Sequence, residues 1–203
     1  MFIRSLFSPA RLPCEEAPFH LDVSLRQISI PMLSLKTVCI LCWMIFISSV
    51  GMSQTSLHVY VFMAEECPVC NYMGKPLKEL AVKYEPSVSF HAVFPVKNSN
   101  YKTAQLFKEQ YGLMSFETLL DADHTLTKKL GASVTPEAVI TDELGNVVYR
   151  GRINSAYYAP GKMKHSSIRN DLDEALSLLL AGKDVPQPWP TPVGCFITMY
   201  ASK

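Results

Sequence analysis

From about residue 56 onward, short runs of apolar residues alternate with longer segments of helical periodicity. The short runs are rich in β-branched and aromatic residues and are bounded by proline, glycine or polar turns, which is typical of strands. They predict strands at Leu57–Met63, Val88–Phe94, Phe116–Leu120, Glu137–Thr141 and Asn146–Arg150. Between them, apolar residues at helical spacing, such as Met73, Leu77 and Leu80, predict helices. The helices are expected at Pro68–Tyr84, Lys102–Tyr111, Leu126–Leu130 and Asp171–Leu180.

The order of these elements predicts a single α/β domain over residues 54–183. Alternating strands and helices favour a mostly parallel sheet that is covered by helices on both faces. Asp142–Gly145 reads as a hairpin turn between the last two strands, so the sheet is expected to be mixed. Residues 184–203 form a proline-rich tail that contains Cys195, and the tail is expected to lie beyond the folded domain.

An uninterrupted apolar run, Val38–Ile47, precedes the domain and is followed by small residues. A spanning helix needs about 20 apolar residues, so this run is short for a bilayer, but it matches the apolar region of a secretory signal peptide. The matching pattern begins at Met32, so we expect the true start there and read residues 1–53 as an upstream extension plus a signal peptide. The protein is therefore predicted to be exported, to a periplasmic or other extracytoplasmic location. If the segment is retained, residues 37–50 would serve as a membrane anchor.

Composition and charge remove several classes of function. Of the 203 residues, 48% are hydrophobic and 18% are charged, as in a folded protein, and the formal net charge is +1. The chain has no block of lysines or arginines, so no nucleic-acid partner is expected, and a membrane is expected only through a retained leader. The six cysteines are too few and too unevenly spaced for a disulfide scaffold. Two of them, Cys39 and Cys42, lie inside the apolar run, where cysteines are usually inert.

The strongest chemical signal is the pair Cys67 and Cys70, which falls where the first predicted strand meets the first predicted helix. Unpaired backbone N–H groups and the helix dipole favour a thiolate at such a junction, and Pro68 suits the first helical position. We expect Cys67 to be the exposed nucleophile and Cys70 the resolving thiol, one turn further along the helix. Glu65 and Glu66 act in the opposite direction, because negative charge raises the pKa of a thiol.

Other chemistries for this pair stay open. Structural zinc normally needs four ligands, and the predicted domain holds no second cysteine pair, so neither a zinc site nor any other cofactor is expected. A non-catalytic Cu(I) or electron carrier would use the two thiolates with His91 or Cys195. Cys195 itself has three interpretations: a third redox thiol in contact with the dithiol, a site of intermolecular disulfide formation, or an inert residue of the tail.

With these motifs in place, the chain from about Leu57 to Lys183 resembles the thioredoxin superfamily, in its exported redoxin branch of TlpA-like and alkyl hydroperoxide reductase/thiol-specific antioxidant-like proteins. The helix and strand at residues 101–120 look like the insertion after the second strand that distinguishes this branch. The resemblance implies a thioredoxin-like α/β fold, with a central mixed sheet, helices on both faces and that inserted helix and strand. It also implies that Pro136 is cis and packs beside the dithiol, and that Thr135 offers its backbone to the substrate.

The function implied is that of a thiol–disulfide oxidoreductase. Its Cys67–Cys70 dithiol would act on protein or low-molecular-weight thiol and disulfide substrates and would exchange electrons with a redox partner protein. Pro68, Glu66 and Cys195 are candidate accessory residues.

A peroxiredoxin-like thiol peroxidase, with antioxidant activity, is the alternative. It would use Cys70 as the peroxidatic residue, and Arg150 or Arg152 would bind the peroxide. The chain departs from the family at Glu66, where an aromatic residue is usual, and it lacks the family's buried acid in the first strand, so Glu65 or Glu66 is left to substitute.

Overall fold

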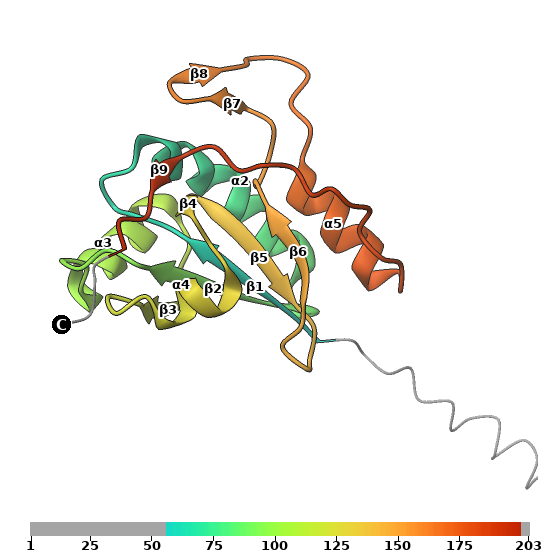
Figure 1. The fold of residues 1–203 in the computed structure, drawn as a ribbon, viewed down its shortest axis with the longest axis horizontal. Helices are drawn as coiled ribbons and strands as arrows, with labels where there is room; N and C mark the ends of the chain where they lie inside the picture. The colour runs from blue at the N-terminus through green and yellow to red at the C-terminus, as the bar shows by residue number, and fades with distance from the viewer. Residues whose placement is uncertain (1–55, 200–203) are drawn as a thin grey trace, which may run out of the picture. The chain divides into compact units, whose positions relative to one another are not determined.

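The computed structural model describes residues 56–199, and a five-stranded mixed sheet in the order β3-β2-β1-β5-β6 forms its centre (Figure 1). Strands β1, β2 and β3 run parallel, whereas β5 is antiparallel to both β1 and β6. The strands of this sheet are β1 (Leu57–Phe62), β2 (Val88–Phe94), β3 (Glu117–Leu120), β5 (Glu137–Thr141) and β6 (Val147–Gly151). The predicted mixed sheet of an α/β protein is confirmed.

Helices cover both faces of the sheet because its strands alternate in what they bury. In β1, Val59 and Val61 belong to the larger core with α2, α3 and α5, whereas Phe62 belongs to a smaller core that Leu130 of α4 covers. The helices are α2 (Pro68–Tyr84), α3 (Tyr101–Tyr111), α4 (Thr125–Leu130) and α5 (Asp171–Leu180). The inserted helix and strand that were expected after the second strand are α3 and β3.

Two short strand pairings were not predicted from the sequence. Tyr157–Ala159 (β7) and Lys162–Met163 (β8) form a small hairpin within the segment that links β6 to α5. Val134–Thr135 (β4) pairs with Cys195–Phe196 (β9), which belongs to the C-terminal tail. The expectation that the tail lies beyond the fold is therefore wrong: its end is hydrogen-bonded to the domain.

The tail reaches β4 along a path that is anchored at several points. After α5, Val185 and Trp189 pack against the larger core, and the Trp189 ring lies 6.2 Å from that of Tyr149. The Pro190 carbonyl then accepts a hydrogen bond of 3.2 Å from the backbone N–H of Arg152. In Figure 1 the tail, drawn in red, runs from α5 across one end of the sheet to β9.

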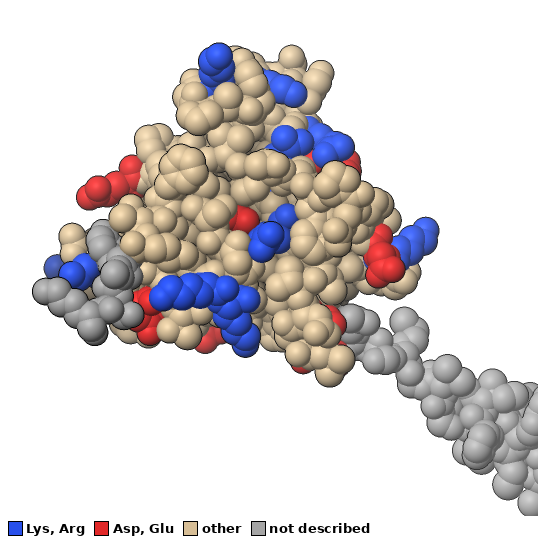
Figure 2. All heavy atoms as spheres, viewed as in Figure 1, with Lys and Arg blue, Asp and Glu red and all other residues tan. Residues whose placement is uncertain are grey.

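Charged side chains do not gather on the face of the molecule seen in Figure 2, where lysines and arginines lie in small separate groups among uncharged residues. Within residues 56–199, no helix has both the length and the apolar character needed to cross a membrane. The predicted leader at 1–53, the start at Met32, the anchor at 37–50 and the pair Cys39 and Cys42 all lie outside the described residues.

Candidate functional site

The site is built on the turn that joins β1 to α2. Cys67 is the N-cap residue of α2, in an extended conformation, and Pro68 occupies the start of the helix, as the sequence suggested. The Cys67 N–H donates to the Ala64 carbonyl over 3.1 Å, which closes the turn between strand and helix. The side chain of Cys67 is thus held at the end of the helix where backbone N–H groups lack intrahelical partners.

The two cysteines of the motif lie together with opposite protonation tendencies. Hydrogen bonds from Cys70, the larger cause, and from Cys195 together lower the pKa of Cys67 from 9.0 to about 4, against the opposing effect of burial. Burial, together with the neighbouring Cys67, raises the pKa of Cys70 well above its usual value. The Cys70 sulfur also accepts a hydrogen bond from the Ala64 N–H at 3.4 Å. Cys67 is therefore the thiolate of the pair at neutral pH.

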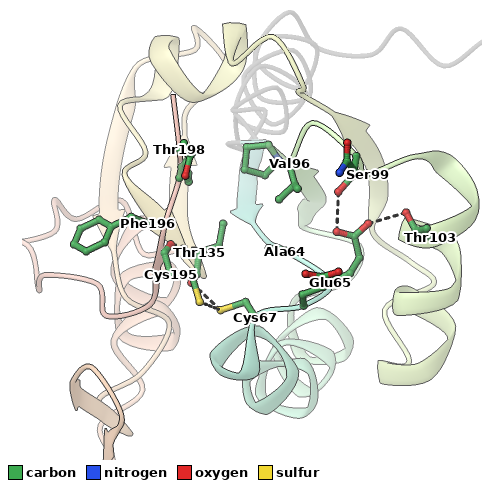
Figure 3. Close-up of a pocket in the computed structure, with 14 residues that line it drawn as sticks. Ala64, Glu65, Cys67, Val96, Ser99, Thr103, Thr135, Cys195, Phe196 and Thr198 are labelled. Carbon is green, nitrogen blue, oxygen red and sulfur yellow. Dashed lines mark hydrogen bonds between the residues drawn. The ribbon is translucent and has the colours of Figure 1, made fainter. Parts of the chain in front are cut away.

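The two glutamates before Cys67 are directed elsewhere. Glu65 accepts hydrogen bonds from Ser99 Oγ at 2.7 Å and from Thr103 Oγ1 at 2.8 Å, so its carboxylate is held by the β2–α3 connection and the first turn of α3 (Figure 3). Glu66 is exposed and lines the cavity beside the dithiol. Because the hydrogen bonds from the two other cysteines outweigh burial, the pKa of Cys67 stays low despite these carboxylates.

The second motif, Thr135–Pro136, stands directly beside Cys67. The Thr135–Pro136 peptide bond is cis, and the Thr135 carbonyl oxygen lies 3.2 Å from the Cys67 sulfur. The structure thus brings together Cys67, Cys70, Thr135 and Pro136, which are distant in the sequence. This is the arrangement that the resemblance implied.

A buried carboxylate that the sequence analysis missed holds this loop in place. Glu137 is 2% exposed, and one of its oxygens accepts hydrogen bonds from the Ser133 N–H at 2.7 Å, the Ser133 hydroxyl at 3.1 Å and the Val134 N–H at 3.2 Å. A buried carboxylate without such donors would be strongly destabilising. The glutamate directly after Pro136, in an otherwise apolar strand, was the available signal.

Cys195 completes a group of three sulfurs. Its Sγ lies 2.8 Å from the Cys67 Sγ, and all three cysteines are free thiols in this structure. Cys67 is only 2% exposed, so the expectation of an exposed nucleophile is wrong for this conformation, and the reason is that β9 lies over it. Burial and the adjacent Cys67 raise the pKa of Cys195 to about 11. Of the three interpretations of Cys195, the geometry matches a thiol in contact with the dithiol.

A cavity of about 360 Å³ opens beside these sulfurs. Its wall comes from the β1–α2 turn, the β2–α3 connection and the tail, and Figure 3 shows Cys67, Val96, Phe196 and Thr198 around it. Glu65 and Glu66 are the charged residues of the wall. A thiol or disulfide entering the cavity would therefore meet acidic, apolar and hydroxyl groups around Cys67.

The remaining candidates lie away from this group. Arg152 is paired with Asp171 at 2.7 Å, Arg150 lies 3.8 Å from Glu137, and neither lines the cavity. His91 contacts His58 at 3.2 Å and Glu117 at 2.8 Å rather than the dithiol. The structure thus assigns these three side chains to contacts elsewhere on the sheet.

Comparison with known proteins gives similarity at the level of structure. No family model matches the chain, and no curated protein matches it. A hypothetical protein from Sinorhizobium meliloti 1021 matches with a TM-score of 0.62 and 24% identity, covering 72% of this chain and 81% of that one. An uncharacterized conserved protein from Geobacillus kaustophilus matches with a TM-score of 0.62 and 25% identity, covering 74% and 81%. A thioredoxin-like protein from Aeropyrum pernix has 26% identity and a TM-score of 0.41, covering 47% and 68%.

The five-stranded mixed sheet, the helices on both of its faces and the dithiol at the start of α2 agree with the resemblance drawn from the sequence. Residues 56–199 thus have the thioredoxin-like fold that the resemblance implied.

Proposed function

We propose that this protein is a thiol–disulfide oxidoreductase that works through Cys67 and Cys70. The observation that carries the proposal is the low pKa of Cys67, about 4, in a sulfur that lies beside both a second thiol and the Thr135 carbonyl. The thiolate is the form of cysteine that attacks disulfides, and a nearby second thiol is needed to release the mixed disulfide. The substrates are protein or small thiol and disulfide compounds, and a redox partner protein restores the starting state.

In the reductive direction, the Cys67 thiolate attacks one sulfur of a substrate disulfide. A bond forms between Cys67 and that sulfur, and the other substrate sulfur leaves as a thiolate and takes up a proton. Cys70 then loses its proton and attacks Cys67, which releases the second substrate sulfur and leaves a Cys67–Cys70 disulfide. Two electrons have passed to the substrate. Each step is reversible, so the same residues oxidise a dithiol in the other direction.

The protonation of Cys70 follows the progress of this reaction. In the reduced protein its pKa is raised by burial and by the neighbouring Cys67. When Cys67 is bound in a mixed disulfide it carries no charge, so one of the causes that raise the pKa of Cys70 is removed. Cys70 therefore becomes a better nucleophile at the stage when it has to attack.

The substrate would occupy the edge of β4 that β9 covers in this conformation, where the backbone of Thr135 offers hydrogen bonds beside the reactive sulfur. Glu137 supports this function by fixing the loop from Ser133 to Pro136. The protein acts outside the cytoplasm. That part of the proposal is supported by the signal-like segment of the sequence.

Reduction of insulin with dithiothreitol as electron donor tests the proposal. Cys67→Ser is expected to abolish the accelerated precipitation of insulin, whereas Cys70→Ser combined with Cys195→Ser, which leaves no second thiol beside Cys67, is expected to accumulate a mixed disulfide between Cys67 and the substrate. Glu79→Gln, at an exposed position of α2, serves as the control and is expected to leave the rate unchanged. Full insulin reduction by Cys67→Ser would refute the proposed function.

A further inference from the structure

The end of the tail occupies the edge of β4 as an added antiparallel strand. Thr135 pairs with Cys195 and Val134 with Phe196, and the Ile197 N–H donates to the Ser133 carbonyl at 3.0 Å. Extended segments often bind proteins in this way, by adding a strand to an exposed edge. The tail thus lies where the proposed function places the substrate, and a cysteine of the tail stands opposite the reactive cysteine.

A glycine permits this close approach. A side chain at Gly194 would collide with the Thr135 carbonyl and with the backbone of the following proline, so any residue with a Cβ would push the strand away. Upstream, Trp189 packs on the core and the Pro190 carbonyl is hydrogen-bonded to Arg152. The pairing of Cys195 with Thr135 is therefore fixed by these contacts upstream of Cys195 and by the Ile197 hydrogen bond downstream of it.

The exposures of the two sulfur-bearing residues differ in a way that matters for chemistry. Cys67 is 2% exposed and Cys195 is exposed, although their sulfurs are only 2.8 Å apart. A large substrate that approaches the docked state meets Cys195 before it can reach Cys67. A disulfide bond needs about 2.05 Å between sulfurs, so only a small movement is required for Cys195 to attack the Cys67 sulfur when Cys67 is part of a disulfide with Cys70.

We infer that Cys195 is a third redox thiol, which carries the disulfide from the buried Cys67–Cys70 pair to the protein surface. This inference rests on the proposed function and deepens it. The tail is then an internal substrate strand, and the form of the protein that reacts with an outside dithiol is the Cys67–Cys195 disulfide.

The exchange conserves atoms and electrons. Cys195 gives up its proton and attacks the Cys67 sulfur, the Cys67–Cys195 bond forms, the Cys67–Cys70 bond breaks, and Cys70 takes up a proton. A thiolate of an outside dithiol then attacks Cys195, and Cys67 departs as a thiolate. The second thiol of the outside dithiol closes its own disulfide and releases Cys195. The substrate has lost two electrons, which Cys67 and Cys70 have gained.

A trapping experiment tests whether the internal disulfide forms. Cys70→Ser protein is treated with glutathione disulfide, alkylated and mapped by mass spectrometry without reduction. The expected product is a Cys67–Cys195 disulfide with release of glutathione. When the Cys70→Ser protein also carries Gly194→Val, it is expected to form no Cys67–Cys195 disulfide and to keep glutathione on Cys67. When it carries Thr191→Val instead, at an exposed position of the tail, the Cys67–Cys195 disulfide should still form. Glutathione on Cys67 without any Cys67–Cys195 disulfide would overturn the inference.

A single-turnover measurement separates this inference from the proposed function. Oxidised protein is mixed with a peptide that contains two cysteines, and the loss of peptide thiols is followed. Cys195→Ser leaves the tail strand docked over Cys67, so the rate is expected to fall by at least about tenfold, the change that 1.36 kcal/mol in the barrier produces. An unchanged or faster rate in Cys195→Ser, with no oxidation at all in Cys67→Ser, would refute the relay and leave the proposed function intact. Oxidation that persists in Cys67→Ser would refute the proposed function itself.

Discussion

Removal of the Cys195 thiol is expected to raise the pKa of Cys67. The pKa of Cys67 is lowered from 9.0 to about 4, first by the hydrogen bond from Cys70 and then, against burial, by the hydrogen bond from Cys195. In Cys195→Ala the backbone pairing of β9 with β4 does not depend on the lost sulfur, so the strand stays in place. The change therefore isolates one hydrogen bond to a thiolate.

The size of the effect follows from the strength of such a bond. Hydrogen bonds to charged groups contribute about 1.5–3 kcal/mol, and 1.36 kcal/mol corresponds to one pKa unit, so the pKa should rise by about 1 to 2 units. Because a depressed thiol pKa means that the thiolate is lost as the pH falls through that value, the variant should lose its thiolate at a higher pH than the native protein. Cys195→Ser keeps a hydroxyl donor and should show a smaller rise.

Absorbance of the reduced protein at 240 nm, where thiolates absorb, measures this change directly. Cys70 and Cys195 both have raised pKa values, so the titration on the acid side belongs to Cys67 alone. The native protein should give a midpoint near pH 4. The reasoning is refuted if the native protein shows no acid-side transition, or if Cys195→Ala titrates at the same pH as the native protein.

Three substitutions test the fold that supports the site, each measured by urea unfolding with the exposed Glu79→Gln as a control. Alanine usually stabilises a helix relative to glycine. A Cβ at Gly74 of α2, however, would stand 2.6 Å from the Tyr111 ring, so Gly74→Ala should lower the free energy of unfolding by about 1–3 kcal/mol. A gain in stability would contradict this packing. Glu137→Gln weakens the charge-assisted hydrogen bonds to the loop from Ser133 to Pro136, so the free energy of unfolding should fall by about 1–3 kcal/mol and insulin reduction should slow. An unchanged stability together with an unchanged rate would show that the carboxylate does not hold the loop. Asp121 accepts bonds from the first N–H groups of α4, so Asp121→Ala should cost about 0.5–2 kcal/mol, as the loss of a helix cap does, and an unchanged midpoint would exclude that capping role.

The main elements of the fold were predictable because their signals are local. The helix that begins at Pro68 and the hairpin around Asp142–Gly145 follow from proline position, apolar spacing and turn residues within a few positions of one another. The third strand begins at Glu117 rather than at Phe116, a difference of one residue that is usual at element ends. A hydrophobic period that continues over many residues is compatible with only one type of secondary structure, so such segments are predictable from the sequence.

The pairing of β4 with β9 left no comparable signal. Each strand has two residues, so neither shows a period, and about sixty positions separate Thr135 from Cys195. The proline-rich sequence before Cys195 indicated only an extended chain. Gly194 was the one local hint, and its meaning depends on the carbonyl that it approaches in space. Contacts over such separations are set by packing.

The sequence predicted that the dithiol contains a reactive thiolate, but it did not predict how the opposing effects on the pKa of Cys67 combine. The position of Cys67 at a helix start pointed to a thiolate, while Glu65 and Glu66 pointed the other way, and the sequence alone did not rank the two effects. In the structure Glu65 is held by Ser99 and Thr103, which lie 34 and 38 residues away in the chain. The pKa of Cys67 is decided by such distant partners.

The reduction potential of the Cys67–Cys70 couple is the most direct test of the central claim that Cys67 is a stabilised thiolate in a redox-active dithiol. Stabilising the thiolate stabilises the reduced form, so equilibration with glutathione buffers should give a strongly oxidising value, close to the −120 mV or so of DsbA. A potential at or below about −270 mV, the thioredoxin value, would contradict the account, as would the absence of any disulfide at Cys67 in the oxidised protein.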